Sequence, residues 1–188
     1  IGVRPFSSTV ETTLFNRLLT VSKAMIKYLY LSFIPYPLNV YHKINLSVSL
    51  AEPKVLLAIT AIIGLIIIAV LIARKQKLIS FSLFWFFLCL APVANIFPTG
   101  IIMAEKYAYA ASLSASLILG FIIYKLVTTN KNVLKIVGLL SLLLITIAYG
   151  YLTFQRNFAW KNNEALWLKT LEQRPDYGRV YNNLGFVY

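Results

Sequence analysis

A long uncharged stretch constrains this chain more than any other feature of its sequence. Residues 55–73 read VLLAITAIIGLIIIAVLIA and contain no charged side chain. As an α-helix this run is roughly 29 Å long, which is close to the hydrocarbon thickness of a bilayer. Hydrocarbon offers no water to backbone amides, so a run of this kind satisfies them as a helix. The sequence therefore predicts a transmembrane helix, which ends at the basic cluster Arg74, Lys75 and Lys77.

The composition extends this prediction to most of the chain. Hydrophobic residues make up 59% of the 188 residues and charged residues only 13%, whereas soluble domains carry about 25% charged residues. Further apolar runs cover residues 18–41, 81–97, 107–127 and 133–153. We therefore expect an all-α fold, a polytopic membrane helix bundle of about five spans.

Two of these runs contain features that modify the prediction. The run 18–41 includes Lys23 and Lys27, one helical turn apart, so a re-entrant or interfacial helix is the alternative to a crossing. Pro92 is expected to kink the helix of run 81–97. In the fourth run small residues favour close helix contact in lipid, namely Ser112, Ser114, Ser116 and Gly120.

The charged loops predict how the chain is oriented in the membrane. The loops after the second and fourth spans hold basic residues and no acidic ones: Arg74, Lys75, Lys77, Lys125, Lys131 and Lys135. The other two loops carry Glu52 and Glu105. The positive-inside rule places the basic loops in the cytoplasm and the residues after 153 outside it. Since the rule accounts for much of the net charge of +12, we expect no nucleic-acid partner.

The residues after 153 differ in kind from those before them. They lack a membrane-length apolar run, and their apolar residues recur at helical spacing on both sides of Pro175. The spacing of a tetratricopeptide repeat (TPR) is met by Trp167, Pro175, Tyr181, Leu184, Gly185 and Tyr188. We therefore expect a membrane domain of residues 1–153 and the first TPR helices in residues 154–188. Pro175 would end a helix, and Gly185 would let a neighbouring helix approach closely.

Residues with the potential for metal or nucleophile chemistry are few. Cys89 and His42 each occur once, so neither has a companion with metal-ligand spacing. We expect Cys89 to be a small apolar residue in the helix and His42 to lie at the membrane interface. The residues imply no metal site. The chain does not begin with Met and its last helix stops at Tyr188, so we expect a segment of a longer protein.

The order of these elements resembles a known family. The matching positions are Arg17, Thr20, Tyr28, Leu29, Pro37, Leu38 and Tyr41, then Ala104, Glu105, Lys106, Tyr107, Tyr109 and Ser112. With the apolar spans and the TPR pattern, they resemble the GT-C superfamily of membrane glycosyltransferases, of the O-mannosyltransferase-like type that carries TPRs. The chain would be the C-terminal membrane part of such an enzyme and the start of its TPR domain.

The resemblance implies a set of substrate-binding residues: Glu105, Lys106, Tyr107, Tyr109 and Arg17. Lys106 would hold the phosphate of a lipid-linked sugar while Glu105 orients Lys106 or an acceptor. A structural explanation stands beside it, because Glu105 is favoured near a helix N-terminus and tyrosines suit the membrane interface. The family usually has Arg where Lys106 stands, and Lys lacks the bidentate fork of Arg. The family's catalytic acid lies in a loop that is absent here, so no catalytic residue is expected.

The resemblance implies transfer of a sugar from a polyprenyl-phosphate donor to protein hydroxyls outside the cytoplasm, with the TPRs binding the acceptor protein. The alternative is a non-enzymatic scaffold, in which the spans anchor repeats that recruit partner proteins. A transporter half is a third reading with less support, because the spans show no strong inverted repeat. The lipid bilayer is a partner in each case. We expect a bacterial or archaeal cell membrane, or the ER membrane of a eukaryote, with the TPR tail extracytoplasmic.

Overall fold

The computed structural model describes residues 13–94 and 101–188. Its α-helices are α1 (Leu14–Phe33), α2 (Pro53–Ile72), α3 (Lys77–Leu90), α4 (Ala108–Val127), α5 (Asn132–Ala159), α6 (Asn163–Gln173) and α7 (Gly178–Gly185), with 3-10 turns η1 (Ala91–Val93) and η2 (Glu105–Tyr107). Within these ranges no strand forms, although Tyr41 and Ala104 make an isolated antiparallel bridge. The expected all-α class is confirmed.

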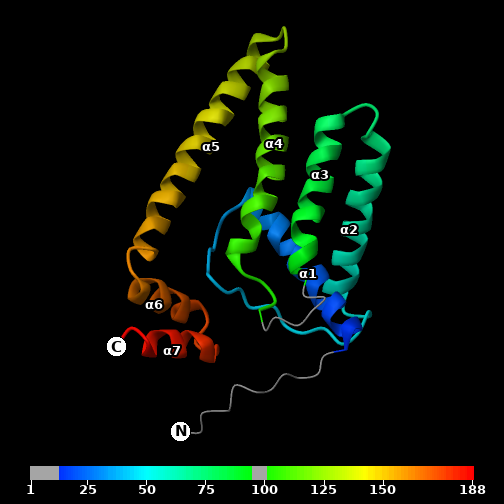
Figure 1. The fold of residues 1–188 in the computed structure, drawn as a ribbon. Coiled ribbons are helices and arrows are strands. Elements are labelled where there is room, and N and C mark those ends of the chain that lie inside the picture. The colour runs from blue at the N-terminus through cyan, green and yellow to red at the C-terminus, as the bar shows by residue number, and fades with distance from the viewer. Residues whose placement is uncertain (1–12, 95–100) are drawn as a thin grey trace.

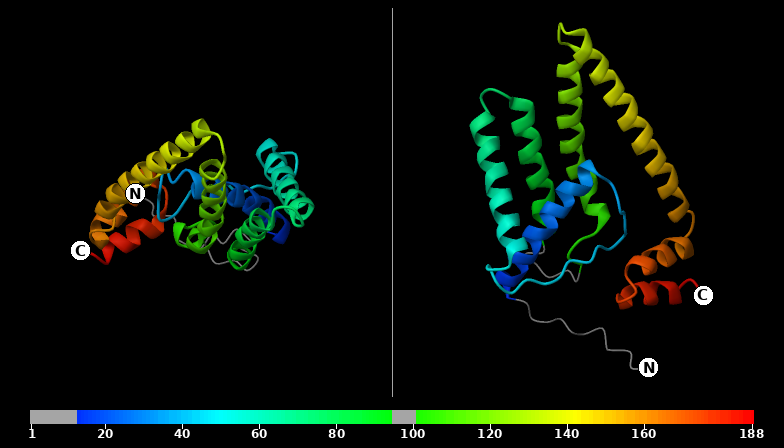
Figure 2. Two further views of the ribbon diagram at one scale, coloured as in Figure 1. Left: turned by 90° about the horizontal axis from the view of Figure 1, so that it is seen from above. Right: turned by 180° about the vertical axis from the view of Figure 1, so that it is seen from behind.

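Helices α2 to α5 form two hairpins that stand side by side, with α3 packed against both α2 and α4 (Figure 1). The turns within the two hairpins, which include Arg74 and Lys131, lie at one end of the molecule, while α6 and α7 lie at the other (Figure 2). This is the relative placement that the charge distribution predicts. The side of the membrane on which each end lies stays a prediction.

The described part of the chain has three helices that are long and apolar enough to cross a membrane: Pro53–Ile72, Glu105–Val127 and Asn132–Ala159. The apolar helix Lys77–Val93 is shorter. Pro92 does not kink a continuing helix, since α3 ends at Leu90 and Pro92 lies in the turn η1. Residues 95–97 of the predicted third span lie outside the described residues. The structure thus supports three crossings, and the total of about five stays a prediction.

Helix α1 runs obliquely to the other long helices (Figures 1 and 2). Its first half lies beside the start of α2, because the Lys23 Nζ atom is 2.9 Å from Glu52 Oε1 and the amide of Ser47 donates to Thr20 Oγ1 at 3.0 Å. The chain that follows α1 returns to the end of the molecule where α2 begins (Figure 1). This arrangement favours the re-entrant or interfacial alternative for α1 over a crossing.

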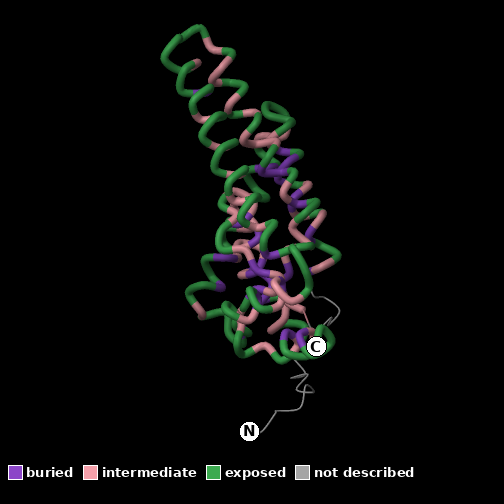
Figure 3. Tube along the Cα trace, turned by 90° about the vertical axis from the view of Figure 1, so that its left-hand side faces the viewer, coloured by how far each residue is buried: buried purple, intermediate pink, exposed green. Residues whose placement is uncertain are grey.

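The buried core lies in the half of the molecule nearer the tail, where α1, α3 and α4 meet. It consists of Ala24, Tyr28, Leu31, Phe86, Leu90, Met103 and Ala111. Cys89 is half-buried and packs against this cluster, as expected of a small apolar residue. The α4–α5 hairpin turn, at the far end, has few buried residues (Figure 3). The long helices on either side of this turn expose many Leu, Ile and Val side chains, which suits contact with lipid.

Close helix packing occurs at a glycine outside the predicted set of small residues, Gly138. A Cβ atom added at Gly120 would meet nothing within 4 Å, so the predicted close contact is not made there. A Cβ atom added at Gly138 would lie 2.9 Å from both Leu126 Cβ and Val127 Cγ2. The two helices therefore meet closely just after the turn, where α5 passes the end of α4.

This contrast predicts opposite outcomes for two matched substitutions. Gly138→Ala forces α4 and α5 apart, and we expect it to lower the free energy of unfolding by about 1–3 kcal/mol. Gly120→Ala meets no neighbour and should be neutral or stabilising by up to about 1 kcal/mol, because Ala favours the helix. Thermal unfolding of both variants in the same detergent measures the difference. Equal midpoints would contradict the packing described here.

Candidate functional site

The segment before α4 is held against α1 and the loop 34–52 by backbone contacts. The Tyr28 hydroxyl donates to the Ala104 carbonyl and accepts from the Ala104 amide, both at 3.0 Å. The His42 amide donates to the Met103 carbonyl at 3.2 Å. Three segments distant in sequence are thereby fixed together immediately before Glu105, so the position of this carboxylate is set by buried backbone.

Glu105 forms an ion pair with Arg156 near the end of α5. The Glu105 Oε2 atom lies 2.7 Å from Arg156 Nη2, and the two side chains are only 18% and 15% exposed. The other carboxylate oxygen, Oε1, lies 3.8 Å from His42 Nε2. The pair ties the entry of α4 to the exit of α5, and both charges are largely removed from water. A buried carboxylate needs such a partner, because an isolated one costs several kcal/mol.

His42 is a buried neutral base beside this ion pair. Burial is the main cause that lowers its pKa from 6.5 to about 4, and the positive charges of Lys27, Arg156 and Arg174 lower it further. The imidazole Nε2 and the facing Glu105 Oε1 are both buried and lack a hydrogen-bond partner. At neutral pH the group therefore consists of one carboxylate, one guanidinium and an uncharged imidazole.

The lowered pKa of His42 predicts a stability that depends on pH. The unfolded state binds a proton at His42 below about pH 6.5, whereas the folded state does so only below about pH 4. The stabilisation is therefore complete above pH 6.5 and is lost as the pH falls toward 4, by about 2 kcal/mol after discounting partial solvation. Thermal midpoints measured between pH 4 and 7 should show this slope in the native chain. A His42→Gln variant with the same slope would contradict the assignment.

The predicted substrate-binding residues differ in their surroundings. Glu105 faces Arg156, while Lys106 is exposed and its Nζ lies 5.2 Å from the centre of the Tyr107 ring. Tyr107 packs against the core cluster, whereas Tyr109 is 87% exposed. Arg17 lies on α1, with its Nε and Nη1 atoms buried and lacking hydrogen-bond partners. Among the described residues, no hydrogen bond or ion pair joins Arg17 to Glu105 or Lys106.

Arg156 and His42 lie beside Glu105, and neither was among the predicted site residues. Arg156 follows an apolar run and precedes a polar tail, where a basic residue is ordinary. One signal was available, because a Glu at the edge of an apolar helix requires a cation nearby. Several lysines and arginines satisfied that requirement equally well, so the partner was decided by the packing of α5.

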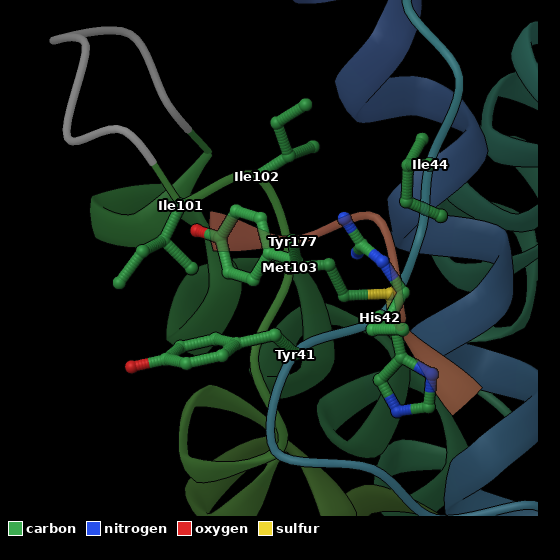
Figure 4. A pocket seen from close by; sticks show the side chains of 8 residues that line it. Tyr41, His42, Ile44, Ile101, Ile102, Met103 and Tyr177 are labelled. Carbon is green, nitrogen blue, oxygen red and sulfur yellow. The ribbon is translucent and has the colours of Figure 1, made fainter. Parts of the chain in front are cut away.

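The tail helices dock on the loop that follows α1. The Tyr41 ring lies 6.1 Å from the Trp167 ring in a stacked arrangement and 5.4 Å from the Tyr177 ring edge-to-face. Lys43 Nζ pairs with Asp176 Oδ2 at 2.7 Å. A cavity of about 80 Å³ lies at this junction, and Figure 4 shows Tyr41, His42 and Tyr177 around it. The docking places α6 and α7 next to Glu105, Arg156 and His42.

Within the tail, α6 and α7 pack against each other on either side of Pro175 (Figure 1). Leu184 is buried, and the Tyr181 hydroxyl donates to the Pro175 carbonyl at 3.0 Å. The Tyr188 hydroxyl donates to Glu164 Oε1 at 2.9 Å. A Cβ atom at Gly185 would meet nothing within 4 Å, so no close helix approach occurs at this glycine in the structure. The assignment to a TPR stays a prediction.

Comparisons with known proteins give three similar sequences. Over 95 residues, half of this chain, it is 26% identical to mouse (Mus musculus) "Protein O-mannosyl-transferase TMTC3", and the match to the human (Homo sapiens) protein of that name has the same extent. Over 115 residues, 61% of this chain, it is 30% identical to "Protein O-mannosyl-transferase Tmtc2" of Drosophila melanogaster.

The aligned parts are small shares of these relatives. The chain spans 10% of the length of the TMTC3 proteins and 12% of Tmtc2. No protein family profile matches the chain, and no solved structure matches it. The chain is thus distantly similar to protein O-mannosyl-transferases, which is consistent with a role in glycosyl transfer.

Proposed function

We propose that this chain is part of an integral-membrane glycosyltransferase of the GT-C type. It takes part in transferring a sugar from a polyprenyl-phosphate donor to protein hydroxyls outside the cytoplasm, and its tail helices begin a TPR domain that binds the acceptor. The observation that carries the proposal is the similarity to protein O-mannosyl-transferases over half of the chain. Three apolar helices of membrane length support the location of this part in a bilayer.

The exposed charge of Lys106 and the ion pair of Glu105 suggest different roles for these two neighbouring residues. Lys106 is exposed at the start of a membrane-length helix that covers Glu105–Val127, where a lipid phosphate lies at headgroup depth. A cation at that depth stabilises the phosphate as it departs with negative charge. Glu105 is committed to Arg156, so its role in this proposal is to position η2 and hence the neighbouring Lys106. Tyr107 and Tyr109 follow the lysine in sequence and suit the membrane interface.

Lys106→Gln in the full-length protein tests the phosphate role. A charge-assisted contact is worth about 1.5–3 kcal/mol, so we expect sugar transfer to fall roughly 10- to 100-fold while expression stays unchanged. The matched control is Lys131→Gln, a lysine at the opposite end of the bundle, which should transfer sugar at the native rate. Transfer by Lys106→Gln equal to that of the control would eliminate the role.

A non-enzymatic scaffold is the second candidate, favoured by the surface of the tail. Tyr181, Phe186 and Tyr188 are exposed aromatic side chains on or just after α7, and aromatic residues are enriched where proteins bind each other. In this case the membrane helices anchor the tail and a partner protein covers these side chains. The sequence upstream of this chain separates the candidates, because the enzyme requires many more spans and an acidic residue pair in its first outer loop.

A further inference from the structure

A second charged cavity lies near the tail end of the bundle, apart from Lys106. Its volume is about 440 Å³, and it lies between α1, the loop 43–52 and the first turn of α2. Its charged lining residues are Lys23, Lys27, Lys43, Glu52 and Lys54. We call this cavity the lysine pocket. Four lysines and one glutamate give it an excess of positive charge.

Two of the four lysines form ion pairs with carboxylates in the part of the chain that the structure describes. Glu52 pairs with Lys23 at 2.9 Å, and its pKa is lowered by hydrogen bonds from Ser47 and Lys23. Asp176 from the tail pairs with Lys43 at 2.7 Å. Among the described residues, no carboxylate lies within ion-pair distance of Lys27 or Lys54. Two of the four ammonium groups thus form no ion pair among the described residues, and the cavity keeps an excess of positive charge although Glu52 also attracts Lys54.

The position of α2 indicates at which level of the membrane the lysine pocket lies. Helix α2 begins at Pro53 and is long and apolar enough to cross the hydrocarbon core, so its first turn marks where that core begins. Lys54 belongs to this first turn and lines the pocket. The ammonium groups of Lys27 and Lys54 are thereby held near the depth at which lipid phosphates lie, and lysine binds phosphate as a point charge.

We propose that the lysine pocket binds the phosphate group of a membrane lipid. Lys27 and Lys54 supply the charge, while Glu52 and Asp176 pair with the other two lysines. A cavity of about 440 Å³ is in the size range of pockets that enclose a small molecule, which suits a headgroup. This proposal is independent of sugar transfer, because any lipid with an accessible phosphate meets the requirement. The two proposals are tested independently, because the experiment below does not depend on the role of Lys106.

Binding of defined lipids to the full-length protein in detergent tests the proposal. The probes are phosphatidic acid, diacylglycerol with the same acyl chains but no phosphate, and inorganic phosphate, and native mass spectrometry counts the bound lipid. The variant Lys27→Gln with Lys54→Gln should bind phosphatidic acid at least about tenfold more weakly. The control Lys131→Gln with Lys135→Gln, at the opposite end, should bind it like the native protein. Diacylglycerol should not bind detectably to the native protein or to either variant.

Several outcomes would overturn the proposal. If the pocket variant and the control bind phosphatidic acid equally well, Lys27 and Lys54 do not form the binding site. If the native protein binds diacylglycerol as tightly as phosphatidic acid, the phosphate group is not what the pocket recognises. Inorganic phosphate that binds as tightly as the lipid would make the pocket a site for a free anion. Lys27→Arg with Lys54→Arg keeps the charge and should keep the binding. If the double Gln variant does not elute as a single species, Lys54→Gln alone carries the test, since Lys54 is exposed.

Discussion

Glu105→Gln is expected to lower the free energy of unfolding by about 3–5 kcal/mol. The substitution leaves the Arg156 guanidinium, only 15% exposed, opposite an uncharged amide. Removal of one partner of a buried ion pair costs this much because the remaining charge is left uncompensated away from water. Thermal or denaturant unfolding in detergent measures the loss.

Two companion variants separate the ion pair from a general effect of charge. Lys106→Gln changes the neighbouring residue, which is exposed, and should shift stability by less than about 0.5 kcal/mol. Arg156→Gln should cost about as much as Glu105→Gln, and the double variant should cost clearly less than the sum of the two. Additive losses would mean that the two side chains do not act as a pair.

Trp167→Ala is expected to detach the tail helices from the loop that follows α1. Trp167 stacks on Tyr41, which also contacts Tyr177, so this substitution removes the largest ring of the aromatic cluster that joins the two parts. Truncation of a packed Trp costs about 3 kcal/mol. The population with a detached tail should therefore rise roughly 100-fold, and hydrogen exchange of residues 34–52 should quicken accordingly.

Phe186→Ala is the matched control for this prediction. Phe186 is an aromatic residue of the same tail, but its side chain is 83% exposed and makes no ring contact among the described residues. Its removal should leave exchange in the loop unchanged. If both variants quicken exchange to the same degree, the cluster around Tyr41 does not hold the tail in place.

Much of the fold could be predicted from local sequence because it depends on patterns that act over a few turns. The uncharged run 55–73 predicts a helix of membrane length, and α2 covers all but its last residue. Pro175 separates two apolar repeats, and the structure places a helix on either side of it. Pro92 shows the limit of such patterns, since a proline near the end of a run can either kink a helix or end it.

The oblique course of α1 could not be predicted in the same way. Its two lysines were compatible with snorkelling from a crossing helix and with a polar cavity. Contacts from other parts of the chain decide the course of α1. Glu52 and Ser47 contact its first half, and Tyr149 contacts its last residue, Phe33. Such contacts depend on how the loop 34–52 returns along the bundle, and residue spacing carries no information about that path.

By itself, the sequence determined which segments avoid water and which end of the bundle carries the basic loops, because hydropathy and charge are properties of each residue. The tertiary structure alone decided that Glu105 pairs with Arg156 instead of with its neighbour Lys106, and that Tyr41 receives Trp167. A carboxylate removed from water takes whichever cation the packing brings to it. The packing of α5 against α4 brings Arg156 to Glu105, and the packing of the tail against the loop 34–52 brings Trp167 to Tyr41.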